Sequence, residues 1–337
     1  MTGIPGSDRF IDVTPVLKGQ SGDRKYRAKT GAGESLLLRV GGRSEYKRKK
    51  AEYEMLERAH AAGIPTPCPL EFGVCANGDP YAILGWRECF DAERLLPRLP
   101  REARFALGVQ SGALLRRLHA LPAPTDAAAW AERFRRKIAA RAEAYAAMPE
   151  KHPGADLVRD CLISRQNLLD ARPQSFNHGD YSAGNLIVSP GGKLSVIDFN
   201  AYNGGYGDPW WELGQDADGD YLNGQLAGYF EGNPPPGYFP LCAYYAAYGA
   251  LAAVCDTRAG EWRIWDARGG NRAPRARALV VRQHARGRPR VVSARHLTQW
   301  LSFGSCASSI RRTSSSFMPC IFAMCGPRKS SSSSSDL

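Results

Sequence analysis

A polar block followed by two short apolar runs, between residues 177 and 199, constrains the fold of this 337-residue chain more than any other feature. The block has the sequence Asn-His-Gly-Asp-Tyr-Ser-Ala-Gly-Asn and ends at Asn185. The apolar runs 186–188 and 194–199 flank a Ser-Pro-Gly-Gly segment that is typical of a tight turn. We therefore predict a β-hairpin that brings Asn185, at the start of its first strand, close to Asp198, at the end of its second.

The side chains expected at this end of the hairpin have the chemistry that phosphoryl transfer needs. The amide oxygen of Asn185 and the carboxylate of Asp198 are hard oxygen donors of the kind that Mg²⁺ prefers, with phosphate oxygens and waters as its other ligands. Asp180 precedes Asn185 by five residues, which places it to accept a proton from an attacking hydroxyl. The alternative is that Asp180 and Asp198 are solvated turn residues, which this spacing disfavours.

These residues carry a family resemblance. The pattern His-x-Asp-x-x-x-x-Asn followed by Ile-Asp-Phe resembles the catalytic and metal-binding loops of the aminoglycoside phosphotransferase and choline kinase superfamily, distant relatives of protein kinases. The Gly-Asp-Pro segment at 207–209 also matches, and the resemblance covers about residues 10–255. It implies an α+β, bilobal protein-kinase-like fold with ATP or GTP as the phosphoryl donor, Mg²⁺ as cofactor and Asp180 as the catalytic residue.

The resemblance also assigns residues to the nucleotide. The place of the nucleotide-covering loop is taken by four residues: Gly19, Gln20, Ser21 and Gly22. The purine is expected at the hinge near Leu84 to Trp86, held by backbone groups. The two glycines alone would also fit an ordinary hairpin turn.

The third strand carries Arg39 where protein kinases have a phosphate-pairing lysine, a pattern that some members of the superfamily share. A guanidinium can still neutralise phosphate charge, and the alternative is a plain surface charge at a strand end. The expected helix partner of Arg39 is Glu52. Glu54 is the alternative, because both lie early in the same predicted helix and only one can face the strand.

Two further polar residues are assigned supporting roles. We expect His178 to hold the shape of the catalytic loop through backbone hydrogen bonds, with a general-base role as the alternative. We expect Asp208 to fix loop geometry by capping rather than to bind substrate.

The order of predicted elements gives the domain organisation. Strands at 11–17, 24–28, 35–40, 70–75 and 81–86 and a helix at 44–62, capped by Ser44, form a small antiparallel-sheet N-lobe over residues 1–86. Helices at 101–120 and 126–148 begin a larger, mostly helical C-lobe over residues 87–255. Residues 256–337 form an atypical basic tail without sustained periodicity, which we expect to be poorly structured.

The net charge of +12 belongs to this tail. Residues 256–337 contain 15 basic and 4 acidic residues, which leaves 30 basic and 29 acidic residues before them. The predicted catalytic body is therefore close to neutral, and no nucleic-acid module is recognisable in the tail. Its arginine- and serine-rich composition suggests a shifted reading frame after about residue 254, so the alternative function is a nucleotide-binding pseudoenzyme or an inactive gene product.

The remaining features favour a cytoplasmic protein. The nine cysteines are scattered and contain no Cys-x-x-Cys pair, which favours reduced thiols over a disulfide framework or a zinc site. No signal peptide is recognisable, and the uncharged run at 237–255 is predicted to be a buried helix rather than a membrane span.

The predicted function is transfer of the ATP γ-phosphoryl group to a hydroxyl of a small molecule.

Overall fold

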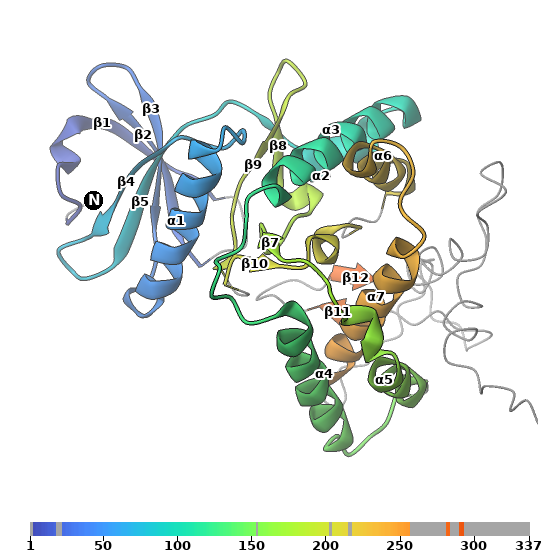
Figure 1. Ribbon diagram of the computed structural model, residues 1–337. Coiled ribbons are helices and arrows are strands. Elements are labelled where there is room, and N and C mark those ends of the chain that lie inside the picture. Colours follow the sequence, from blue (N-terminus) through green and yellow to red (C-terminus); the bar gives the residue numbers. More distant parts are fainter. Residues whose placement is uncertain are drawn as a thin grey trace, which may run out of the picture. The chain divides into compact units, whose positions relative to one another are not determined.

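The computed structural model describes residues 3–17, 22–152, 154–201, 204–214 and 218–256, and the backbone of 281–283 and 290–292 (Figure 1). The strands are β1 (Phe10–Pro15), β2 (Arg24–Thr30), β3 (Ser35–Val40), β4 (Pro69–Val74), β5 (Pro80–Gly85), β6 (Phe90–Asp91), β7 (Ser175–Phe176), β8 (Leu186–Val188), β9 (Leu194–Val196), β10 (Tyr206–Gly207), β11 (Val281–Gln283) and β12 (Arg290–Val292). The α-helices are α1 (Tyr46–Ala61), α2 (Ala92–Leu95), α3 (Arg101–His119), α4 (Trp130–Ala146), α5 (Ala155–Ser164), α6 (Gly219–Phe230) and α7 (Tyr238–Asp256).

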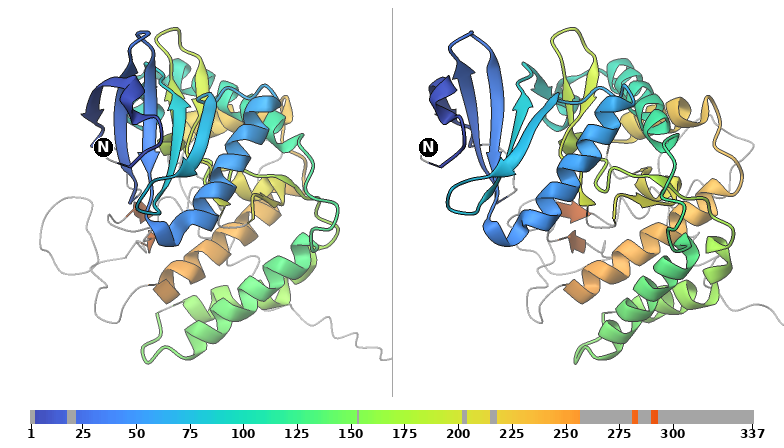
Figure 2. Two further views of the ribbon diagram at one scale, coloured as in Figure 1. Left: turned by 90° about the vertical axis from the view of Figure 1, so that its left-hand side faces the viewer. Right: turned by 60° about the vertical axis from the view of Figure 1, so that its left-hand side comes forward.

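The predicted α+β class is confirmed, because an antiparallel sheet is followed by a mainly helical region. The sheet has the order β1-β2-β3-β5-β4. Side chains alternate along its strands, so that Leu36, Leu38 and Val40 of β3 are buried in one apolar cluster with Tyr81 and Ile83 of β5. Helix α1 runs alongside β4 and β5 (Figure 2).

The start of α1 differs from the prediction. The helix begins at Tyr46, after a 3₁₀ turn at Arg43–Glu45, and Ser44 is not its N-cap. No side chain caps this end. Instead, the Glu45 carboxylate forms an ion pair with Arg48 on the first helical turn, which places negative charge at the helix N-terminus.

The chain forms two compact units, one made of Met1–Trp130 with Arg172–Pro235 and the other of Ala131–Ala171 with Pro236–Leu337. The first unit contains both the sheet and the predicted catalytic hairpin. Since these units are defined by contacts and the predicted lobes by secondary structure, the boundaries at residues 86 and 255 stay a prediction.

Helices α3 and α6 of the first unit pack unusually closely. Gly108 and Gly112 of α3 face Gly224 and Gly228 of α6, with three residues between the two glycines of each pair. A Cβ atom added at Gly112 would lie 1.9 Å from the carbonyl oxygen of Gln225. Only glycine permits this approach of the two backbones, which lie side by side in both Figure 1 and Figure 2.

In the second unit, helix α7 packs through its aromatic residues. Tyr244 donates a hydrogen bond to the carbonyl oxygen of Leu162 at 2.7 Å, and the Tyr245 ring lies 5.1 Å from that of Phe134. The predicted helix is thus present over Tyr238–Asp256. By length and composition it could also cross a membrane, with a mean hydropathy of 1.3 and 61% of its most apolar window buried.

Two predictions, the nucleotide loop and the basic tail, concern residues that the structure leaves largely undescribed. Gly19, Gln20 and Ser21 of the predicted nucleotide loop lie outside the described residues, whereas Gly22 is described and exposed. The predicted tail lies outside them too, apart from residue 256 and the backbone of β11 and β12, which pair with each other in antiparallel fashion.

Candidate active site

The predicted hairpin is present and forms one wall of the candidate site. Strands β8 and β9 pair Leu186 with Val196, and beyond this pair the Ile197 N–H donates to the carbonyl oxygen of Asn185 at 3.0 Å. Residue 198 therefore follows directly on a backbone pair that includes Asn185. The Pro-Gly-Gly turn signal accounts for this local geometry, because a tight turn fixes the strand register.

Asn185 also holds Asp180. The Asn185 Nδ2 group donates to the Asp180 backbone oxygen at 2.8 Å and to its Oδ2 atom at 2.9 Å. Because both amide protons are directed at Asp180, the Oδ1 atom of Asn185 is the atom of this side chain that can bind a cation. The structure thus brings together the predicted catalytic carboxylate and one predicted metal ligand.

Asp198 is the second predicted metal ligand, and its backbone is unusual. Its φ is +64°, a left-handed conformation that aspartate tolerates better than most residues. The Arg39 Nη2 atom lies 2.8 Å from Asp198 Oδ1. Burial by itself would raise the pKa of Asp198, but the charges of Arg39 and Lys25 outweigh it and lower that pKa, so the carboxylate is ionised at neutral pH.

Arg39 has a second partner that the sequence analysis missed. The Nε and Nη2 atoms of Arg39 donate to Asp23 Oδ2 at 3.1 and 2.7 Å. The same carboxylate lies 2.9 Å from Lys49 Nζ of α1, and its side chain is only 1% exposed. Burial acts to raise the pKa of Asp23, but Arg39 and Lys49 lower it overall. Asp23 thus joins the sheet to α1 at the site.

The predicted pairing of Arg39 with Glu52 is wrong, and so is the alternative with Glu54. Glu52 contacts Arg48 at 2.6 Å and Lys49 at 3.1 Å, the residues four and three positions before it on α1. Helix geometry makes these the nearest cations, so Glu52 is neutralised within its own helix. Glu54 lies 3.6 Å from Lys50. Glu52 reaches Arg39 only indirectly, through Lys49 and Asp23.

His178 is fully buried and bonded to backbone on both sides of its ring. Its Nε2 atom lies 2.9 Å from the carbonyl oxygen of Ile197, and its Nδ1 atom accepts from the Asp180 N–H at 3.3 Å. With the Nδ1 atom as acceptor, the Nε2 atom carries the proton. This geometry is that of the predicted supporting role, in which His178 ties the loop of Asp180 to the segment that leads to Asp198.

The buried carboxylate of Glu212, which was not predicted, also holds the loop of His178 and Asp180. Glu212 accepts hydrogen bonds from the backbone N–H groups of His178, at 2.8 Å, and Gly179. Its Oε2 atom also lies 3.0 Å from His119 Nε2, and the other ring nitrogen of His119 lies 2.9 Å from the Tyr229 hydroxyl. Burial opposes the charge of Glu212, but the hydrogen bond from His119 lowers its pKa overall.

Asp208 stabilises the next segment. Its Oδ1 atom accepts from the Trp210 N–H at 2.8 Å, which caps the 3₁₀ turn at Pro209–Glu212. Both of its carboxylate oxygens also bind the Arg172 guanidinium, at 2.5 and 2.9 Å. The side chain is fully buried, and it combines the cap geometry expected from the sequence with an ion pair to Arg172 that was not predicted.

The packing of α3 against α6 also supports the loop that carries Asp180. The Tyr181 hydroxyl, next to Asp180 in the chain, donates to the Ser111 carbonyl oxygen at 2.8 Å. The Ser111 hydroxyl of α3 in turn accepts from the Tyr221 hydroxyl of α6 at 2.6 Å. Because Ser111 precedes Gly112, the close glycine contact aligns the residues that hold Tyr181.

At the predicted purine hinge, the backbone N–H groups form hydrogen bonds with other residues of the protein. The Gly85 N–H donates to the Cys68 carbonyl oxygen at 2.8 Å, and the Trp86 N–H donates to that of Ser35 at 3.1 Å. Leu84 is buried, and the Arg27 guanidinium stacks 4.8 Å from the centre of the Trp86 ring. The backbone donors at residues 85 and 86 are therefore already bonded.

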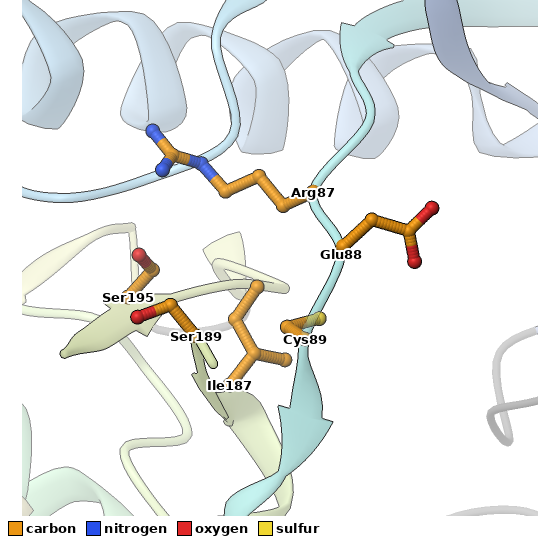
Figure 3. Close-up of a pocket in the computed structure, with 6 residues that line it drawn as sticks. All are labelled: Arg87, Glu88, Cys89, Ile187, Ser189 and Ser195. Carbon is orange, nitrogen blue, oxygen red and sulfur yellow. The ribbon is translucent and has the colours of Figure 1, made fainter. Parts of the chain in front are cut away.

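A cavity of about 200 Å³ begins immediately after these residues (Figure 3). Its walls come from the segment that follows β5 and from the hairpin β8–β9, and in the close-up the Glu88 carboxylate points away from the hairpin residues. The lining residues are Arg87, Glu88, Cys89, Ile187, Ser189 and Ser195.

The side chains of the site fit a magnesium ion for which the protein supplies only some of the ligands. Within the part of the chain that the structure describes, no group of three or more His, Cys, Asp or Glu side chains could hold a metal. Asn185 and Asp198 offer two hard oxygen donors. Mg²⁺ is commonly held by one or two carboxylates together with substrate phosphates, so these two residues fit such a site.

A family comparison decides the classification. The model of the phosphotransferase enzyme family matches residues 12–241, more than half of the chain. The chain belongs to this phosphotransferase enzyme family. A comparison with curated proteins finds no significant match.

Solved structures agree with the family's fold. A choline/ethanolamine kinase family protein from Mesorhizobium loti aligns with a TM-score of 0.54 and 18% identity, over 75% of this chain and 82% of that protein. The ternary complex of APH(2'')-IIa with streptomycin and ATP aligns with a TM-score of 0.54 and 14% identity, over 75% and 91%. The ADP-bound aminoglycoside phosphotransferase APH(2'')-Ib gives 0.54 and 14%, over 74% and 86%. At these identities the likeness concerns the fold.

Proposed function

We propose that this phosphotransferase-family protein transfers the γ-phosphoryl group of ATP, or of GTP, to a hydroxyl group of a small molecule. The observation that carries the proposal is the arrangement of Asp180, Asn185 and Asp198 at one end of the β8–β9 hairpin. The fold neighbours bound to ATP and ADP support a nucleoside triphosphate as the donor.

In the proposed reaction, Asp180 orients the acceptor hydroxyl and takes its proton. A bond forms between the acceptor oxygen and the γ-phosphorus, and the bond from the γ-phosphorus to the β,γ-bridging oxygen breaks, so that the nucleoside diphosphate leaves with that electron pair. The two hydrogen bonds from Asn185 keep the Asp180 carboxylate in one orientation. Arg39 contributes positive charge that offsets the phosphates.

A magnesium ion would be held by Asn185 and Asp198, where it would neutralise the charge that develops on the phosphate oxygens. We place the purine in the cavity next to Arg87, Glu88 and Cys89 and against Ile187, one step along the chain from the hinge expected from the sequence. The residues 19–22 would cover the phosphates, as the family resemblance implies.

The acceptor belongs to the classes used by the fold neighbours. Their names point to aminoglycosides and to choline or ethanolamine, all of which carry hydroxyl groups. We propose a small-molecule acceptor, with neither a nucleic acid nor a membrane as partner. The six described cysteines are free thiols, which supports action in the reducing cytoplasm.

An ADP-release screen of hydroxylated metabolites and antibiotics tests this proposal. The full-length protein is incubated with ATP, Mg²⁺ and each acceptor, and the phosphorylated product is identified by mass spectrometry. We expect at least one acceptor to yield product and ADP in equal amounts. Nucleotide binding without product across the panel would instead favour the pseudoenzyme that the basic tail suggests.

A further inference from the structure

Three basic side chains gather around the carboxylates of Asp23 and Asp198. Two of them, Arg39 and Lys49, are described above, and the third is Lys25 of strand β2. Lys25 lies directly opposite Arg39 in the antiparallel register of β2 and β3. Directly opposed residues project from the same face of a sheet, so Lys25 and Arg39 share the face that meets Asp198.

The three cations differ in their partners. Arg39 is bound by both Asp23 and Asp198, and Lys49 lies between Asp23 and Glu52. Lys25 is half-buried, yet it has neither a hydrogen bond nor an ion pair with any residue that the structure describes. The ammonium nitrogen of Lys25 remains accessible to solvent, so its three donors can reach an anion from outside the described chain.

The electrostatics agree with this geometry. Burial lowers the pKa of Lys25, and the positive charges of Arg39 and Lys49 lower it further, while Asp198 and Asp23 act in the opposite direction. The two carboxylates that favour the charged ammonium are the ones already bound by Arg39 and Lys49. Additional negative charge beside Lys25 would therefore be stabilised.

We propose that Lys25 binds a phosphate group of the nucleotide, as a second cation one strand away from Arg39. This inference rests on the proposed function. A lysine suits the task because its compact ammonium offers three donors to phosphate oxygens in any orientation. Arg39 can then remain bonded to Asp23, which keeps the strand and helix α1 together while Lys25 meets the ligand.

The experiment compares the binding of nucleotide with that of adenosine, which has the purine and no phosphate. Binding of a fluorescent ATP analogue and of unlabelled adenosine in competition with it is measured for full-length wild type, Lys25→Met and Lys25→Arg. The matched control is Lys29→Met on the same strand and face; the Lys29 side chain is 49% exposed, and its Nζ atom lies 4.0 Å from Asp12 Oδ2. Thermal unfolding checks that each variant is folded.

We expect Lys25→Met to weaken binding of the ATP analogue by about 10- to 100-fold, the effect of losing one charge-assisted hydrogen bond. Adenosine affinity should be unchanged, Lys25→Arg should recover part of the loss, and Lys29→Met should match wild type. Equal binding of the ATP analogue by wild type and Lys25→Met overturns the inference alone. Failure of wild type to bind nucleotide at all overturns both the inference and the proposed function.

Discussion

Arg39 Nη2 lies 2.8 Å from Asp198 Oδ1, so the cation of the third strand directly contacts the carboxylate at the end of the β8–β9 hairpin. The same Nη2 atom lies 2.7 Å from Asp23 Oδ2. One guanidinium therefore bridges two carboxylates that belong to different parts of the first unit. The planar guanidinium of an arginine can do this, whereas a lysine side chain is shorter and its ammonium binds as a point charge.

The bridge predicts that Arg39→Lys is not a conservative change. Lysine would keep the positive charge but lose at least one of the two carboxylate contacts, which would loosen Asp198. We expect the nucleotide KM to rise about tenfold, since a charge-assisted hydrogen bond of about 1.5 kcal/mol or more is lost. Steady-state kinetics at saturating acceptor measure this change, and an unaltered KM would argue against the bridge.

Asp23 predicts a specific dependence of stability on pH. Its pKa in the folded protein lies below the ordinary value of 3.8, because Arg39 and Lys49 outweigh burial. A depressed pKa contributes stability at pH values above the unfolded pKa, and this contribution disappears as the pH falls through the folded pKa. The difference in free energy of unfolding between wild type and Asp23→Asn should therefore be larger at pH 7 than at pH 3.

Urea unfolding at the two pH values provides the measurement, and Glu54→Gln is the control. Glu54 is 58% exposed and lies 3.6 Å from Lys50, so its removal should change stability by less than about 1 kcal/mol at either pH. A pH-independent effect of Asp23→Asn would show that its contribution is packing rather than charge.

The sequence predicted local features of this site better than those that depend on tertiary contacts. The hairpin and the adjacency of Asn185 to residue 198 follow from a turn signal between two apolar runs, both of which are local features. The Glu52 pairing failed because the competing cations Arg48 and Lys49 lie on the same helix. Asp23 carried a weak signal, an acidic residue after the glycine loop, but its partners Arg39 and Lys49 come from two separate elements, β3 and α1.

The residues that hold the loop of Asp180 in place show the same contrast between local features and tertiary contacts. Glu212 lies three residues after the Gly-Asp-Pro segment at 207–209, which matches the family pattern, yet its bonds to the backbone of His178 and Gly179 depend on how this part of the chain folds back. The glycines of α3 and α6 resemble ordinary helix-weakening residues in the sequence. The need for glycine at these positions becomes apparent only from the contact between the two helices.

Those glycines give a prediction about stability. Gly112→Ala would place a methyl group 1.9 Å from the Gln225 carbonyl oxygen, so the helices must separate. We expect a loss of about 3 kcal/mol in the free energy of unfolding. The control is Gly249→Ala in the interior of α7, where a Cβ atom meets nothing within 4 Å. That change should stabilise by about 0.5–1 kcal/mol through helix propensity, as chemical denaturation can determine.

Glu212 gives a prediction about turnover. Glu212→Gln keeps one acceptor oxygen but turns an amide N–H₂ group toward backbone donors or toward His119. The loop that carries Asp180 would shift, so kcat should fall by about tenfold or more while the nucleotide KM, which depends on the other residues, changes little. A selective rise in KM with normal kcat would indicate that Glu212 acts on the nucleotide instead.

The most direct test of the central claim is the rate of phosphoryl transfer by Asp180→Asn, measured in single turnovers with ATP, Mg²⁺ and an acceptor that wild type phosphorylates. Asparagine has nearly the same shape but cannot take the hydroxyl proton. We predict a rate about 10²–10⁴-fold below wild type, with unchanged thermal unfolding and nucleotide affinity. A folded Asp180→Asn variant that transfers phosphoryl groups at the wild-type rate would contradict it.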